Sequence, residues 1–190
     1  MKKIMFNDKY GLTQSVLEGR KTMTRRMANA WERQDGTLSG WMPGAYKVGE
    51  EVAVAQSYET LANSGTRQLE LMMETSSTFK NKYCGAGWNN KMFVKADLMP
   101  HRIRITEIKV ERLKDISEND CLKEGIKKIP HPFVKDAANV YTCHGIDGFY
   151  THPKDCFADL IDKVSGKGTW ERNPWVFAYG FELIKKNNIF

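Results

Sequence analysis

Gly19-Arg20-Lys21-Thr22-Met23-Thr24-Arg25-Arg26 carries four cations and two β-branched hydroxyl residues in one short stretch. If this stretch is extended, its even-numbered residues lie on one side and its odd-numbered residues on the other. A bend near Lys21 would instead bring its ammonium to the Thr24 hydroxyl, a pair that can hold an anion or activate the hydroxyl as a nucleophile. The alternative interpretation is a basic, solvated turn without a ligand, because lysine and arginine side chains are usually exposed.

A short helix is predicted just before this stretch, over residues 13–19. Thr13 can cap its N-terminus, and Gly19 suits the left-handed position just past its end. Cations that follow a helix also complement its dipole. Arg20 and Lys21 therefore have a structural reason for their positions as well as a functional one.

Period-two alternation predicts strands at residues 51–58, 92–96, 102–113 and 175–184. The strongest of these is 102–113, where Ile103 and Ile105 alternate with cations and Ile108 continues the pattern one residue out of step. Such a slip indicates a β-bulge or bend, which a small barrel needs at its corners.

Two more helices are predicted. Ser117 can cap the first, at residues 117–125. The second spans residues 153–165 and carries an apolar stripe that begins at Phe157. Several strands with short helices between them favour a mixed α+β fold, and we expect a small β-barrel with short flanking helices.

The remaining segments have the composition of loops. Residues 27–47 are rich in glycine and polar side chains, and Trp31 and Trp41 are expected to anchor them. Residues 60–91 and 127–150 are expected to be insertions in a single domain that spans residues 1–190. Aromatic rings in the second insertion either pin the loop to the body or stack on nucleobases.

The composition is that of a globular protein, with 41% hydrophobic and 27% charged residues. A formal net charge of +6 favours polyanionic partners. No apolar run approaches the roughly 20 residues that cross a bilayer, and the apolar start of the chain is too short for a secretory signal. We therefore expect a cytoplasmic protein without a membrane partner; the oligomeric state is left open.

No metal or cofactor is expected. The four cysteines contain no Cys-x-x-Cys pair, and the four histidines are scattered along the chain. The spacing from Cys143 to Cys156 fits none of the common zinc patterns. Reduced thiols and surface imidazoles are the preferred interpretation.

Several motifs together resemble the ASCH domain family, whose fold is a PUA-like β-barrel. The first stretch resembles its Gly-Arg-Lys-Thr-x-Thr-x-Arg signature. Three later stretches also look like family motifs, in the same order along the chain: residues 48–52, 110–118 with 124–126, and 168–177. The resemblance spans nearly the whole chain and implies a role near RNA or modified nucleosides.

One branch of that family contains small amidohydrolases that remove the acetyl group from N4-acetylcytidine. Their lysine and threonine match Lys21 and Thr24, and their glutamate is matched here to Glu124. By this analogy Thr24 attacks the acetyl carbonyl, Lys21 acts as the base if burial lowers its pKa, and Glu124 orients it or shuttles protons.

Three functions are therefore considered. The first is a protein that binds RNA or a modified nucleoside in a basic cleft, and the residues expected to make it are Arg20, Lys21, Thr22, Arg25, Arg26, Arg102 and Arg104. The second is an amidohydrolase of acylated nucleosides that uses Lys21, Thr24 and Glu124. The third is a ribonuclease, or a regulatory protein without catalysis. The binding protein is the main hypothesis, and the amidohydrolase is its main rival.

Overall fold

The computed structural model describes residues 1–63, 88–135 and 137–184. Most of the insertion expected at residues 60–91, including Cys84, lies outside these ranges. The chain divides into two compact units. One consists of Met1–Phe6, Glu51–Arg104 and Leu183–Phe190, and the other of Asn7–Glu50 and Ile105–Glu182. In the described ranges, no helix has the length and apolar character needed to cross a membrane.

The first unit contains β1 (Lys3–Ile4), β5 (Glu51–Val54) and the start of β6 (Arg102–Arg112). β1 runs parallel to β5, and β5 runs antiparallel to β6. The predicted strand at residues 51–58 is confirmed over β5, but the chain turns into helix α2 (Tyr58–Asn63) before that range ends. One hydrophobic cluster in the core of this unit contains Ala53, Ala55, Tyr58, Leu61, Val94 and Met99.

The predicted strand at residues 92–96 is wrong. The structure has two 3₁₀ turns there, η1 (Lys91–Phe93) and η2 (Ala96–Leu98). The Asn90 side chain accepts a hydrogen bond from the Met92 N–H at 3.0 Å, and the Lys3 ammonium donates to the Val94 carbonyl at 2.9 Å. These side chains satisfy backbone groups locally, so the segment does not need strand partners.

In the second unit, β2 (Met23–Met27) runs antiparallel to β9 (Trp175–Ile184), with Met23 opposite Gly180. β9 also neighbours β6. The predicted strands 102–113 and 175–184 are therefore confirmed. β9 is buried on both faces, since Ala178 and Tyr179 are each only 1% exposed.

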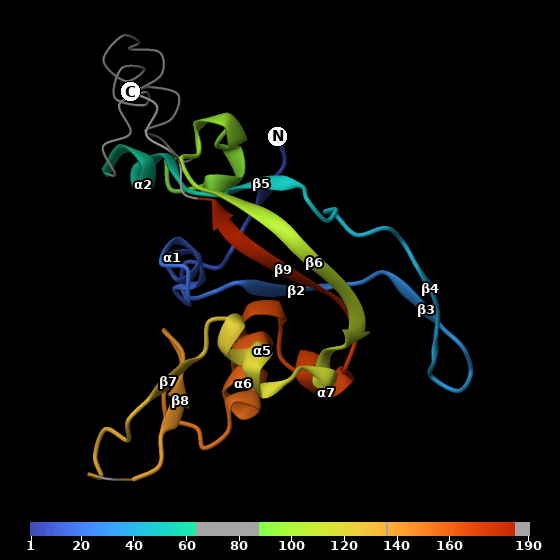
Figure 1. The fold of residues 1–190 in the computed structure, drawn as a ribbon, viewed down its shortest axis with the longest axis vertical. Helices are drawn as coiled ribbons and strands as arrows, with labels where there is room; N and C mark the ends of the chain where they lie inside the picture. The colour runs from blue at the N-terminus through green and yellow to red at the C-terminus, as the bar shows by residue number, and fades with distance from the viewer. Residues whose placement is uncertain (64–87, 136, 185–190) are drawn as a thin grey trace. The chain divides into compact units, whose positions relative to one another are not determined.

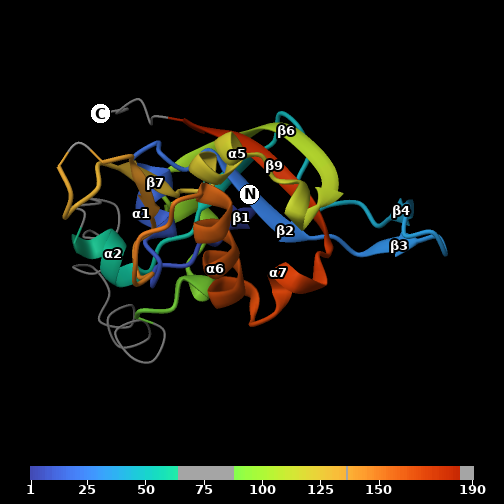
Figure 2. The same ribbon diagram turned by 90° about the horizontal axis from the view of Figure 1, so that it is seen from below.

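The described residues of the second unit also form four α-helices, α1 (Leu12–Leu17), α5 (Glu118–Lys123), α6 (Pro153–Ser165) and α7 (Thr169–Arg172), and one 3₁₀ turn, η3 (Leu113–Asp115). α5 contacts both β2 and α6, and α6 contacts α7. Both ribbon views show α6 and α7 as neighbours (Figures 1 and 2). The predicted cap of α5 is confirmed, because the Ser117 hydroxyl accepts a hydrogen bond from the Asp120 N–H at 3.1 Å.

The cap predicted for α1 is wrong. The N-cap residue is Gly11, with φ at 61°, and Thr13 lies inside the helix. The Thr13 hydroxyl instead donates to the Asp8 carboxylate in the preceding turn. The predicted end of this helix is confirmed, since Gly19 has φ at 72°.

Two of the segments expected as loops contain short ribbons. Residues 27–47 include β3 (Ala30–Glu32) paired with β4 (Leu38–Trp41), and residues 127–150 include β7 (Lys127–Ile129) paired with β8 (Val140–Thr142). In both views β3 and β4 lead away from α5 and α6 (Figures 1 and 2). Trp31 and Trp41 are 55% and 48% exposed, so the expectation that they anchor this segment is wrong.

The fold is thus mixed α+β, as predicted, with one five-stranded sheet and a few short helices. Among the pairings of the described residues, β1 pairs with β5 and β2 pairs with β9, and neither strand has a partner on its other side. No closed barrel is found in this part of the chain.

Candidate functional site

Lys21 is fixed by the chain that joins α1 to β2. Its backbone N–H donates to the Ser15 carbonyl at 2.9 Å, and the Thr22 N–H donates to the Lys123 carbonyl at 2.9 Å. The junction is therefore attached both to α1 and to the end of α5. The Lys21 side chain starts from this fixed backbone and is only 1% exposed.

Glu124 receives the Lys21 ammonium. This residue is the C-cap of α5, and its side chain is 6% exposed. The Lys21 Nζ lies 2.6 Å from Glu124 Oε2 and 2.8 Å from the Glu124 backbone oxygen. The sequence hypothesis required these two side chains to meet, and they form a buried ion pair.

Arg25 holds the other oxygen of the same carboxylate. Its Nη1 lies 3.1 Å from Glu124 Oε1, and its Nη2 lies 2.6 Å from Glu111 Oε1 and 3.6 Å from Asp120 Oδ2. Two cations thus meet three carboxylates, and Lys123 also pairs with Asp120 at 3.1 Å, so the formal charges of the cluster cancel. Because every group in it has a charged partner, the cluster can remain ionised away from water.

The pKa values of the two cations shift in opposite directions. Burial lowers the pKa of Lys21, and the nearby Arg26 charge lowers it further, although the Glu124 carboxylate opposes both. Burial also lowers the pKa of Arg25, but Glu124 and Glu111 outweigh this effect and raise it. The lowered pKa of Lys21 is the chemically relevant shift, because it raises the population of the neutral amine, which can accept a proton.

Thr24 lies on β2 directly opposite Tyr179, and Arg26 lies opposite Phe177. Paired and alternate residues of antiparallel strands share a face, so these four side chains lie on one side of the sheet. Thr24 is 5% exposed, and among the described residues its hydroxyl has no hydrogen-bond partner. The structure therefore brings Lys21 to Glu124, but it does not bond Thr24 to either of them.

A pocket of about 280 Å³, called here the pocket beside Thr24, opens on this face; Thr24 itself does not line it but lies opposite its lining residue Tyr179. Arg26, Phe177 and Tyr179 line it together with residues 42–45 of the chain that follows β4. The Tyr179 ring also meets the edge of Tyr46, with ring centroids 5.3 Å apart. A Cβ atom at Gly44 would lie 2.2 Å from the Tyr179 hydroxyl, so only glycine allows this close approach.

The other residues predicted for the site are distributed differently. Arg20 pairs with Glu18 at 2.5 Å, and Thr22 contributes its backbone to the β2–β9 pairing. Arg102 and Arg104 belong to the other unit, where both face Glu51, at 4.0 and 3.2 Å. Arg25, expected to contact a ligand, is buried in the ionic cluster.

Sequence reasoning missed Glu111 and Asp120. Glu111 lies near the end of β6, inside the motif at residues 110–118, to which no site role was given. Asp120 lies in the first turn of α5, where the helix dipole alone is enough to favour an acidic residue. No sequence signal marks these two carboxylates, because the burial of Lys21 and Arg25 that requires them is known only from the structure.

Comparison of the chain with protein-family models, with curated proteins and with solved structures finds no match. Within the described ranges, no cluster of three or more histidine, cysteine, aspartate or glutamate side chains is suited to hold a metal ion. The site is therefore interpreted from its own geometry.

Proposed function

We propose that the protein hydrolyses the acyl amide of a small acylated nucleoside, such as N4-acetylcytidine. The observation that carries this proposal is the buried pair of Lys21 and Glu124, in which a lysine of lowered pKa is held 2.6 Å from a carboxylate. Lysines whose pKa is lowered by burial beside a specific charge partner recur at catalytic sites. The Thr24 hydroxyl, three residues further along, supplies the nucleophile.

In the first half of the reaction, Lys21 takes a proton from the Thr24 hydroxyl and then gives it to the leaving nitrogen. The Thr24 oxygen attacks the acyl carbon while Lys21, in its neutral form, accepts the hydroxyl proton. Lys21 then returns that proton to the exocyclic nitrogen as the carbon–nitrogen bond breaks. Water then attacks the acyl-threonine, and Lys21 passes a proton from the water to the Thr24 oxygen as the ester bond breaks and the carboxylic acid leaves. Glu124 keeps the lysine in place throughout.

The pocket beside Thr24 supports a small substrate rather than a polymer. Its volume of about 280 Å³ lies just below the roughly 300–1,000 Å³ of typical ligand pockets. Phe177 and Tyr179 offer aromatic surface to a base, and Arg26 offers hydrogen-bond donors.

The test is release of acetate from N4-acetylcytidine by the purified protein. We expect turnover by the native chain and a loss of at least about a hundredfold in Thr24→Val and in Lys21→Met, the range typical for removal of a general base or nucleophile. Absence of release from this and related N-acyl nucleosides by the native protein, with its fold intact, would refute the proposal.

Matched control variants exist on β6. Lys109 and Glu107 form an exposed pair at 2.9 Å, each 49% exposed, and Thr106 is an exposed threonine on the same strand. Lys109→Met and Thr106→Val repeat the two chemical changes outside the cluster. They should keep native turnover, and an equal loss in these controls would show that the effect is not specific to the site.

A second candidate is binding of RNA or a modified nucleoside without catalysis. The net charge of +6 and the position of exposed Arg26 beside the pocket favour it. The burial of Lys21 and Arg25 in ion pairs argues against both as phosphate contacts. Nucleoside binding that survives Thr24→Val, with no turnover in the native chain, would favour this candidate.

A further inference from the structure

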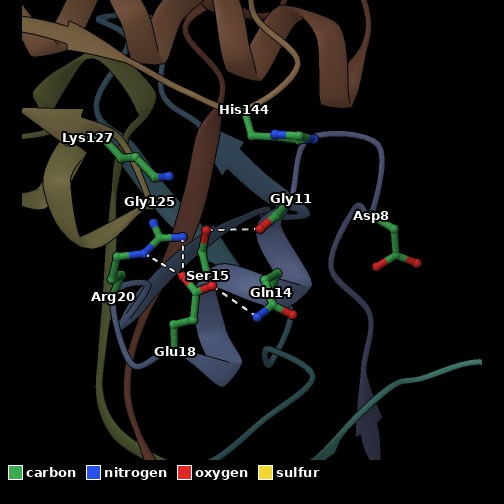
Figure 3. A pocket seen from close by; sticks show the side chains of 9 residues that line it. All are labelled: Asp8, Gly11, Gln14, Ser15, Glu18, Arg20, Gly125, Lys127 and His144. Carbon is green, nitrogen blue, oxygen red and sulfur yellow. Dashed lines mark hydrogen bonds and ion pairs between the residues drawn. The ribbon is translucent and has the colours of Figure 1, made fainter. Parts of the chain in front are cut away.

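A second pocket, of about 370 Å³, lies on another side of the same unit. It shares no lining residue with the pocket beside Thr24. Figure 3 shows Lys127 and Arg20 entering from one side, His144 lying across another, and Asp8 opposite the two cations. Glu18 and Gln14 complete the rim.

Small residues create the hollow. Gly11 and Gly125 both have positive φ, at 61° and 108°, so side chains are strained at these positions. A Cβ atom at Gly11 would lie 3.1 Å from the His144 side chain, and one at Gly125 would lie 3.8 Å from the Lys21 side chain. The imidazole therefore packs directly on Gly11, and the backbone at Gly125 covers the buried lysine.

The carboxylates of the pocket already have partners. Glu18 accepts from Arg20 Nε at 2.7 Å and from Gln14 Nε2 at 3.0 Å, as the dashed lines in Figure 3 mark. Asp8 accepts from the Thr13 hydroxyl. By contrast, within the described ranges neither Lys127 nor His144 has a hydrogen bond or ion pair through its side chain.

We propose that this pocket binds the phosphate group of a small ligand between Lys127 and His144, with Arg20 at the rim. Lysine offers three charged donors, and an imidazole offers at least one donor in either protonation state. Hydrogen bonds from charged donors to phosphate are among the strongest in proteins. The group can be free phosphate or the phosphate of a nucleotide. The proposal does not depend on hydrolysis at Thr24.

The test is a titration of the native chain, followed by the backbone amide NMR signals of Gly11 and Gly125. The probes are inorganic phosphate, cytidine 5′-monophosphate and cytidine, at constant ionic strength set with chloride. We expect saturable shifts with both phosphate-bearing probes and none of these shifts with cytidine. Tighter binding of the monophosphate would identify a nucleotide as the ligand, and equal affinities would show that phosphate alone suffices.

Three variants distinguish phosphate binding in this pocket from nonspecific electrostatic attraction to a basic surface. Lys127→Met should weaken phosphate binding about tenfold or more, the effect expected from loss of one charged hydrogen bond. Glu18→Gln should tighten it, because the change removes a nearby negative charge and releases Arg20. Lys128→Met alters the next residue of β7, which faces the opposite side of the strand, and should leave affinity unchanged.

The proposal is overturned if the native chain shows no saturable shift with either phosphate-bearing probe. It is also overturned if Lys128→Met weakens binding as much as Lys127→Met does. Lys127 and Lys128 are both exposed, so these variants should fold like the native chain, and their unshifted amide signals would verify this.

Discussion

At the scale of single residues, the chain keeps Glu124 ionised by giving each carboxylate oxygen its own cation. Lys21 approaches Oε2 and Arg25 approaches Oε1. A buried ion pair is costly to form, but it is far more costly to break, because the partner left behind is a charge without compensation. The cluster therefore fixes the local structure whatever its catalytic role.

Glu124→Gln should destabilise the protein by about 3 kcal/mol or more, because it leaves the buried Lys21 ammonium without a carboxylate. Urea unfolding of both proteins measures the difference. Glu107→Gln is the control, since its exposed pair with Lys109 should be worth less than about 1 kcal/mol. Similar losses in the two variants would contradict this view of the cluster.

The buried thiols give a second prediction at this scale. Burial raises the pKa of Cys121 and of Cys156 from 9.0 to about 12, and it also raises the pKa of Cys143. Since only the thiolate reacts, a shift from 9.0 to about 12 lowers the reactive fraction about a thousandfold near pH 8.

Iodoacetamide at pH 8 should therefore leave Cys121 and Cys156 unmodified in the native protein and label them rapidly in urea. Mass spectrometry of the peptides reads each position separately. Labelling at equal rates in the two conditions would show that these side chains are not buried in solution.

At the scale of elements, α5 is the support for the site. Its first turn supplies Asp120 and its C-cap is Glu124, so both ends of this short helix take part in the ionic cluster. A helix of six residues is not stable alone. Its packing against β2 and α6, together with its N-cap, keeps the carboxylates in place.

Ser117→Ala should cost about 1 kcal/mol of stability, because it removes the hydroxyl that accepts from the Asp120 N–H. Denaturant unfolding gives the value. Ser165→Ala, at the exposed end of α6, makes the same chemical change without a cap and should have little effect. An equal effect of the two changes would mean that the cap does not stabilise α5.

At the scale of the whole molecule, the positive charge is partly neutralised where it was expected to bind RNA. Arg20 faces Glu18, both Arg102 and Arg104 face Glu51, and Arg25 is buried. The net charge of +6 belongs to the chain, but these pairs reduce the positive charge at the positions named in the sequence. Small neutral ligands therefore agree better with these contacts than a polynucleotide does.

Salt dependence distinguishes the two ligand classes. Binding of a neutral acylated nucleoside to Thr24→Val should change little between 50 and 200 mM salt, taken as rough limits of the usual range. Single-stranded RNA, if it binds, should show a log–log slope of about −0.7 for each phosphate contacted. A steep slope for the nucleoside itself would contradict a pocket that recognises an uncharged ligand.

The sequence predicted those parts of the fold that depend on local rules. The alternation around Ile103 and the capping hydroxyl of Ser117 identified β6 and α5, because periodicity and capping are properties of neighbouring residues. The turns around Val94 were missed because Lys3, far away in the sequence, donates to its carbonyl. The ribbon β3–β4 was missed because glycines and polar residues in its segment resembled a loop.

For the candidate site, the sequence predicted one central pair of residues but not the contacts around it. Lys21 and Glu124 were paired through a motif resemblance, and the structure joins them. The burial of Arg25 was not predictable, since it depends on Glu111 from a distant strand. No pattern in the sequence indicated the pocket at Lys127 and His144, which forms only where residues from three separate segments meet.

The lack of a side chain at Gly44 helps to set the shape of the pocket beside Thr24. Because the chain at Gly44 touches the phenol oxygen of Tyr179, alanine at that position would push the ring or the chain aside. Either movement would reshape the cavity from its wall without altering Lys21, Thr24 or Glu124. In the proposed hydrolase, a change at this one position would therefore alter which ligands fit while the proposed reactive groups stay the same.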